Sequence, residues 1–220
     1  MSWGLIALNG SITSKTQLVE QMLRVTSSQP FDFVIGVDGG CKLLEILGFN
    51  PNLILGDFDS IENLERYRTK WPASEIKRFP PEKDFTDAEL AFEEISHLAI
   101  DKIIVIGGFG GRADHMISIM HLLMKADNCI MVDEQNILEK IQSPFYRKLN
   151  QADYEGVYIS LVPLLENFEN ITLKGFKYPL NEATITFSQT IGISNEIVEE
   201  VASIEVLKGS GYLVTSRDRY

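Results

Sequence analysis

Cysteine is scarce in this chain of 220 residues, which has only Cys41 and Cys129, far apart and outside any CxxC or Cys/His spacing. Neither a zinc site nor a disulfide framework is indicated, so a reducing compartment is expected. Basic side chains are outnumbered, with 20 Lys and Arg against 31 Asp and Glu, and the formal charge is −11. A chain without excess positive charge has no general attraction for nucleic acid or anionic membranes, and neither is expected as a partner.

Long apolar runs are also absent. The N-terminal segment has no basic region, and its apolar run of about four residues is too short for a signal peptide or a membrane span, so a cytoplasmic protein is expected. Hydrophobic residues make up 45% and charged residues 23% of the chain. These values are those of a folded globular protein, and the length allows one large domain or two small ones.

Two patterns divide the chain. Residues 1–143 alternate short apolar runs with amphipathic stretches, which predicts an α/β domain whose mostly parallel sheet is covered on both faces. Residues 144–220 are β-rich with frequent turn signals, which predicts a small all-β, sandwich-like domain. The first domain is expected to have strands at Leu5–Leu8, Phe33–Val37, Leu53–Leu55, Lys102–Ile106 and Cys129–Val132, and helices at Lys15–Val25, Cys41–Gly48, Asp87–Leu98 and His115–Lys125. The expected strands of the second domain are Val157–Val162, Ile171–Leu173, Ala183–Phe187, Ser203–Leu207 and Tyr212–Thr215.

A pair of acidic residues, Asp57 and Asp59, directly follows one predicted strand, at the end where open α/β sheets bind ligands. In extended backbone, positions two apart face the same way, so the two carboxylates would point at one place. Two such charges about 4 Å apart repel by about 4 kcal/mol at an effective dielectric near 20. A divalent cation removes that repulsion, and oxygen-only ligands favour Mg²⁺. A solvated turn would also place aspartates here.

A second acidic stretch, Lys83-Asp84-Phe85-Thr86-Asp87, opens a predicted helix. Asp84 and Asp87 would lie near one another in the first turn. Ordinary helix capping explains acids at this position equally well. The neighbouring Lys83 favours a clamp in which a cation binds phosphate and carboxylates bind metal.

The glycine-rich segment 107–111 lies between a predicted strand and a predicted helix, and Arg112 follows it. Glycines let the backbone approach a ligand closely, a helix N-terminus offers unpaired N–H groups, and Arg112 adds a planar cationic fork. Together these features suit a phosphate. The segment Asp38-Gly39-Gly40 repeats the strand, glycine and helix pattern more weakly.

The same glycine-rich turn also fits a dinucleotide fingerprint. Gly108-x-Gly110-x-x-Ala113 has the required spacing, and Asp133 stands where a ribose-binding acid would be. A nicotinamide or flavin oxidoreductase is therefore an alternative, although it leaves Asp57 and Asp59 unexplained.

Five motifs occur in a fixed order between residues 34 and 197. They are Val37-Asp38-Gly39-Gly40, Gly56-Asp57-Phe58-Asp59-Ser60-Ile61, Lys83-Asp84-x-Thr86-Asp87-x-Glu89, Gly110-Gly111-Arg112-x-Asp114-His115 and Gly192-x-Ser194-Asn195-Glu196. In this order and spacing the chain resembles the thiamine pyrophosphokinases of bacterial type. Their two-domain plan agrees with the change of pattern near residue 144.

The resemblance implies transfer of a diphosphoryl group from ATP to the hydroxyl of thiamine, with Mg²⁺, in a homodimer whose active sites lie at the subunit interface. It implies a metal site of Asp57, Asp59 and Asp87. The implied catalytic residues are these three with Arg112 and Asp114, and the implied nucleotide-binding residues are Asp38, Gly39, Gly40, Lys83, Asp84, Thr86, Gly110, Gly111, Arg112 and His115. Ser194 and Asn195 would approach thiamine from the second domain.

The alcohol of thiamine would attack the β-phosphorus of ATP and AMP would leave, with Asp114 or Asp38 as acceptor of the alcohol proton. Two features depart from the family. Ile193 stands where the family usually has Thr, and the second domain has no Trp, so stacking on thiamine would fall to a residue such as Tyr212 or Phe187. A noncatalytic ATP sensor and a phosphatase with an aspartyl nucleophile are the remaining alternatives.

Overall fold

The computed structural model describes residues 1–58, 64–80, 82 and 84–218. The chain forms two compact units, Met1–Glu134 and Gln135–Tyr220. No helix in the described ranges is long and apolar enough to cross a membrane. Both cysteines are buried free thiols, and burial raises the pKa of each to about 12.

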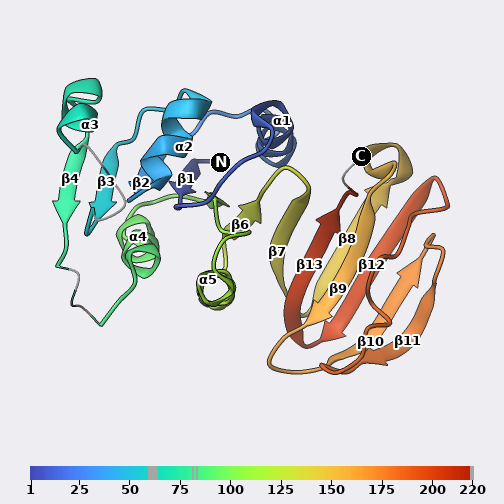
Figure 1. Cartoon of the computed structure of the whole chain (residues 1–220). Coiled ribbons are helices and arrows are strands. Elements are labelled where there is room, and N and C mark those ends of the chain that lie inside the picture. Colours follow the sequence, from blue (N-terminus) through green and yellow to red (C-terminus); the bar gives the residue numbers. More distant parts are fainter. Residues whose placement is uncertain (59–63, 81, 83, 219–220) are drawn as a thin grey trace. The chain divides into compact units, whose positions relative to one another are not determined.

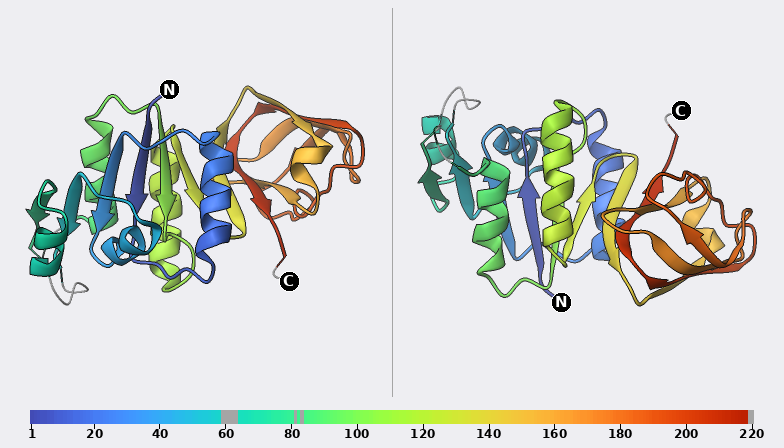
Figure 2. Two further views of the ribbon diagram at one scale, coloured as in Figure 1. Left: turned by 90° about the horizontal axis from the view of Figure 1, so that it is seen from above. Right: turned by 90° about the horizontal axis from the view of Figure 1, so that it is seen from below.

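The first unit is a parallel sheet between two layers of helices (Figure 1). Its strands are β1 (Trp3–Ala7), β2 (Phe33–Val37), β3 (Leu53–Gly56), β4 (Glu75–Arg78), β5 (Lys102–Ile106) and β6 (Cys129–Val132). Its helices are α1 (Lys15–Thr26), α2 (Gly40–Leu47), α3 (Leu64–Lys70), α4 (Asp87–Ser96) and α5 (Ala113–Lys125). Figure 2 shows α1 and α2 over one face of the sheet and α4 and α5 over the other.

Strand order in this unit is β4-β3-β2-β1-β5-β6. The chain winds outward from β1 to β4 and then returns to place β5 on the other side of β1. The order therefore reverses between β1 and β5, and ligands of open α/β sheets bind at such a point, beyond the carboxyl ends of the strands. The central strand β1 is buried along its whole length, and β5 is buried from Ile103 to Ile106, as the apolar runs predicted.

The second unit is a sandwich of two antiparallel sheets (Figure 1). One sheet has the order β7-β13-β9, from β7 (Asn136–Gln142), β13 (Ser210–Ser216) and β9 (Tyr158–Pro163). The other has the order β11-β10-β12-β8, from β11 (Leu180–Ile185), β10 (Phe168–Lys174), β12 (Val201–Lys208) and β8 (Phe145–Asn150). A short 3₁₀ helix, η1 (Gln151–Tyr154), follows β8. Side chains from both sheets form one core, around the fully buried Phe168 and Ile171. The predicted fold class is thus confirmed.

Several elements lie outside the ranges expected from sequence. They are α3, β4, β7 and β8. The strand β7 falls in the part of the chain that the sequence pattern assigned to the first domain, yet it pairs antiparallel with β13 and belongs to the second unit.

Candidate active site

A pocket of about 640 Å³ opens in the first unit where the strand order reverses. Leu8 and Asn9 reach it from the end of β1, and Gly107 and Gly108 from the end of β5. The start of α4 and one face of α5 complete it. The other described residues that line it are Val37, Asp38, Asp57, Phe85, Thr86, Asp87, Ala88, Gly110, Gly111, Arg112, His115, Ser118 and Ile119.

Three carboxylates meet in this pocket. Asp38 follows β2, Asp57 follows β3, and Asp87 begins α4; each offers an oxygen, and these oxygens lie within 4.8 Å of one another. The structure therefore brings together Asp57 and Asp87, which the sequence assigned to one metal site. It adds Asp38, which the sequence assigned to the nucleotide. Asp59 lies outside the described residues.

The backbone around Asp38 fixes its carboxylate. Asp38 has φ 46°, and its Oδ1 accepts a hydrogen bond from the Phe58 N–H at 3.0 Å. Gly56 has φ 147°, and a Cβ there would lie 1.8 Å from Asp38 Oδ1. Only glycine therefore lets β3 run so close to this carboxylate.

The pKa of Asp38 is raised to about 7, chiefly by burial and also by the nearby negative charges of Asp87 and Asp57, against the lowering effect of the Phe58 N–H. A cation among the three carboxylates would offset both causes. A donor set made only of carboxylate oxygens fits a hard divalent cation such as Mg²⁺. The residues present thus fit the metal that the resemblance implies.

The glycine-rich turn also lines the pocket. Gly110 and Gly111 have φ 76° and 67°, and nothing lies within 4 Å of where a Cβ would be on either. Arg112 is the N-cap of α5, and its guanidinium makes two hydrogen bonds to Asp114, Nε to Oδ1 at 3.1 Å and Nη2 to Oδ2 at 2.6 Å. Arg112 and His115, which the resemblance assigns to nucleotide binding, line the pocket.

Not every expected nucleotide-binding residue lies in the pocket. Asp84 and the helix-start glycines Gly39 and Gly40 are not among its described lining residues. A Cβ on Gly40 would lie 1.9 Å from the Ala7 carbonyl oxygen, so this glycine lets α2 pack against β1. Thr86 lines the pocket and also caps α4, where its hydroxyl accepts from the Glu89 N–H at 3.1 Å. Lys83 lies outside the described residues.

The two residues expected to approach thiamine belong to the segment between β11 and β12. Ser194 is exposed, whereas Asn195 is buried. The Asn195 amide accepts from the Tyr178 N–H at 3.0 Å and donates to the Tyr178 carbonyl at 2.8 Å, so it fixes the backbone that carries the exposed Tyr178 ring. Tyr212 is completely buried, which excludes it as a stacking residue, whereas Phe187 is exposed.

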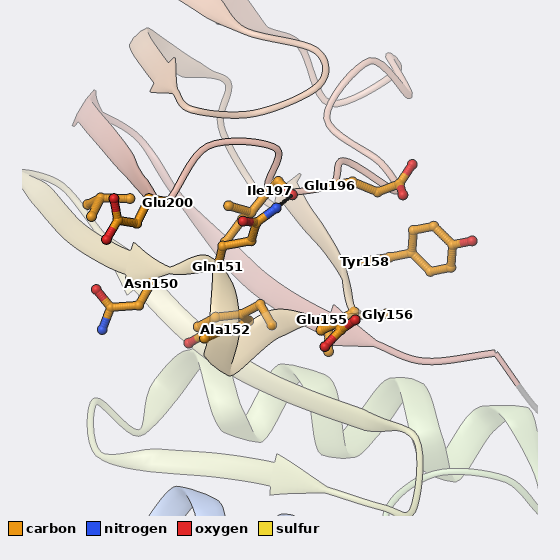
Figure 3. Close-up of a pocket in the computed structure, with 12 residues that line it drawn as sticks. Asn150, Gln151, Ala152, Glu155, Gly156, Tyr158, Glu196, Ile197 and Glu200 are labelled. Atoms are coloured by element: carbon orange, nitrogen blue, oxygen red, sulfur yellow. Dashed lines mark hydrogen bonds between the residues drawn. The ribbon is translucent and has the colours of Figure 1, made fainter.

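The second unit has a pocket of its own, of about 680 Å³ (Figure 3). It lies between η1, the start of β9 and the segment that leads into β12. Its side chains include Tyr158, Glu155, Glu196 and Glu200, and the Gln151 amide donates to the Ile197 carbonyl at its edge. Ser194 and Tyr178 are not among its described lining residues.

Among the residues that line the pocket of the first unit but were not assigned to the site from the sequence are Asn9, Phe85 and Ser118. For two of them, Phe85 and Ser118, the sequence held a feature that could have indicated the site. Phe85 is a half-exposed aromatic ring inside an acidic motif, and Ser118 follows His115 by one helical turn. Asn9 follows β1, and only the strand order shows that this strand borders the site.

A parallel sheet with carboxylates and a glycine-rich turn at its switch point, joined to a β-sandwich, defines a two-domain enzyme of the kinase type. The description "Thiamin pyrophosphokinase, catalytic domain" matches residues 27–132, and "Thiamin pyrophosphokinase, vitamin B1 binding domain" matches residues 147–212. The chain belongs to the thiamine pyrophosphokinase family.

Individual relatives agree with this assignment. The chain is 36% identical over 188 residues to a thiamine pyrophosphokinase of Bacillus subtilis, an alignment that covers 84% of this chain and 87% of the relative. A crystal structure of thiamine pyrophosphokinase from Bacillus subtilis superposes with a TM-score of 0.83 at 29% identity and full coverage of both chains. A crystal structure of thiamin pyrophosphokinase from Geobacillus thermodenitrificans superposes with a TM-score of 0.80 at 30% identity, covering 99% of this chain and 98% of that one.

Proposed function

We propose that this enzyme transfers a diphosphoryl group from ATP to the primary alcohol of thiamine, giving thiamine diphosphate and AMP. The observation that supports this most is the meeting of Asp38, Asp57 and Asp87 in one pocket that a glycine-rich turn and Arg112 also line. A polyphosphate needs positive charge, and an acidic protein obtains it locally from a metal ion, an arginine and a helix N-terminus.

Each part of the pocket has a role in this proposal. The clustered carboxylates, together with Asp59, hold Mg²⁺, which when bound offsets the negative charge on the phosphate oxygens. Gly110, Gly111 and the start of α5 offer backbone N–H groups to the phosphates, and Arg112 adds charge that stabilises the transferring group and the leaving AMP. Positioning and electrostatics of this kind provide most of the rate in phosphoryl transfer.

The second unit is the proposed thiamine-binding part. Ser194 is exposed beside Asn195, and Asn195 holds Tyr178 through two hydrogen bonds. The Tyr178 ring is 57% exposed, so it replaces Tyr212 as the proposed stacking partner of the vitamin. Stacking of an aromatic ring on a cationic thiazolium is favourable in addition to the area that it buries.

A homodimer with shared active sites is also proposed. Five exposed apolar side chains lie on the segments that connect β10 to β11 and β11 to β12, the second of which carries Ser194: Tyr178, Phe187, Ile191, Ile193 and Val198. Exposed apolar side chains grouped in this way mark interaction sites. The cytoplasm is the proposed compartment, supported by two cysteines that are buried free thiols.

One assay tests the reaction. The purified protein is incubated with ATP and Mg²⁺, with and without thiamine, and the nucleotide products are separated. We expect AMP that appears only when thiamine is present, in amounts equal to thiamine diphosphate. ADP or orthophosphate as the product would reject the proposal, and binding without turnover would indicate a sensor. Omission of Mg²⁺ with EDTA present is the control for the metal.

A further inference from the structure

Within the described part of the chain, the guanidinium of Arg112 makes hydrogen bonds along one of its two edges. Its Nε and Nη2 donate to the two carboxylate oxygens of Asp114, and the side chains of both residues are exposed, 73% and 62%. Among the described residues, Nη1 and the second hydrogen of Nη2 have no partner. Arginine binds planar oxyanions through either edge, so one edge remains for a phosphate.

Asp114 is itself held in place. Its Oδ1 accepts from the His115 N–H at 3.0 Å, in the first turn of α5. The carboxylate thus connects the backbone of the helix start to the long side chain of Arg112. Arg112 lines the pocket, whereas Asp114 is not among the described residues that do.

We infer that Asp114 is a positioning residue for Arg112: it fixes one edge of the guanidinium so that the other edge is presented to a phosphate of the nucleotide. The inference rests on the proposed function and assigns Asp114 a role that acts through Arg112. An arginine held in this way loses less conformational entropy when the phosphate binds.

The electrostatics agree with this role and not with proton transfer. The hydrogen bonds from Arg112 lower the pKa of Asp114 to about 2, with a smaller lowering by the His115 N–H. A general base works best when its pKa is near the operating pH, so this carboxylate is a poor acceptor for the alcohol proton.

The test compares Asp114→Asn, Arg112→Ala and the double variant. The primary readout is equilibrium binding of a non-hydrolysable ATP analogue with Mg²⁺ by calorimetry. We expect Asp114→Asn to weaken binding about tenfold, corresponding to roughly 1.4 kcal/mol. Arg112→Ala weakens it more, and the double variant binds within about twofold of Arg112→Ala because the effect of Asp114 passes through Arg112. Asp114→Glu, which keeps the charge, recovers part of the loss.

Turnover provides the second readout. We expect Asp114→Asn to raise the KM for ATP while the pH profile of kcat keeps its shape. Glu93→Gln, an exposed residue outside the pocket, removes the same charge and is the matched control. The inference is overturned if kcat falls about 100-fold or more and its acid limb moves, which is the behaviour of a general base. It is also overturned if Asp114→Asn weakens binding further in the Arg112→Ala background. Failure of the proposed function would be seen separately, because the wild-type protein would then make no thiamine-dependent AMP.

Discussion

Asp57 and Asp87 bring negative charge into the pocket from two separate elements, β3 and α4. Replacement of either by Asn keeps the size of the side chain and removes its charge. We expect Asp57→Asn and Asp87→Asn each to lower turnover by about 100-fold or more, because each change weakens an oxygen ligand of the proposed metal ion where charge develops. Steady-state assays with saturating Mg²⁺ measure the effect, and far-UV circular dichroism checks the fold. Near-normal turnover in one variant would remove that residue from the proposed metal site.

Asp38 predicts a pH dependence of stability in metal-free protein. Its pKa is about 7 in the folded state, against 3.8 for an unperturbed carboxyl. Between these two pH values the unfolded chain releases the proton and the folded protein retains it, so the free energy of unfolding falls as pH rises from about 4 to about 7. We expect Asp38→Asn, which still accepts from Phe58 N–H, to raise stability at pH 8 by a few kcal/mol at most.

Urea unfolding at pH 5 and pH 8 in EDTA measures this difference, with Glu93→Gln as the control for net charge. Added Mg²⁺ should raise the stability of the wild type more than that of Asp38→Asn. An equal gain in both proteins would contradict the placing of Asp38 in the metal site.

At the level of single residues, the sequence predicted part of the candidate active site. Asp57 was found because it directly follows an apolar strand, and Arg112 because it follows a run of glycines. Asp38 was recognised as a ligand-binding residue, but its contact with Asp57 and Asp87 depends on β2 lying next to β3 and on α4 crossing both. The burial that raises its pKa is a property of the folded protein alone.

The helix α4 has a local stabilising contact at its N-terminus that an unfolding experiment can test. Thr86 caps its N-terminus, with the hydroxyl accepting from the Glu89 N–H. We expect Thr86→Ala to lower the free energy of unfolding by about 1 kcal/mol. Thr86→Ser keeps the hydroxyl and should retain most of the stability that the cap provides. Urea titration followed by circular dichroism compares them. Since Asp87 is the first residue of this helix, fraying should also raise the KM for ATP. Equal stability of the Ala and Ser variants would reject the cap.

The sequence predicted strands well where both faces of the strand are buried. The runs that became β2 and β6 are apolar throughout, and β5 is apolar after its first residue, Lys102, which is the pattern of a strand covered on both faces. The strand β4 has the sequence Glu-Ile-Lys-Arg at the edge of the sheet, and partial exposure removes the apolar signal. The strands β7 and β8 alternate weakly and are defined by their partners β13 and β12 far along the chain.

The proposed sharing of active sites between two subunits has a direct test on the whole molecule. Asp57→Asn disables the first unit, and Tyr178→Ala weakens the proposed thiamine contact in the second. If each site combines the first unit of one subunit with the second unit of its partner, a hybrid dimer keeps one intact site. Random mixing should then restore about a quarter of wild-type activity, assayed at low thiamine concentration.

Unfolding and refolding the two variants together, with light scattering to establish a dimer, provides the measurement. Each variant refolded alone is the control. A mixture no more active than the mean of the two controls would mean that each site is built within one chain, and a monomer by light scattering would reject the homodimer.

Both native thiols are shielded from solvent, and burial also keeps them protonated at neutral pH. A maleimide reagent should therefore leave Cys41 and Cys129 unmodified, because the thiolate is the reactive form. A single cysteine introduced at Ile117, an exposed position on α5, would be the sole attachment point for a fluorophore. The two native cysteines therefore need not be replaced before such labelling. A change in the fluorescence of the attached dye would then report nucleotide binding at the start of that helix.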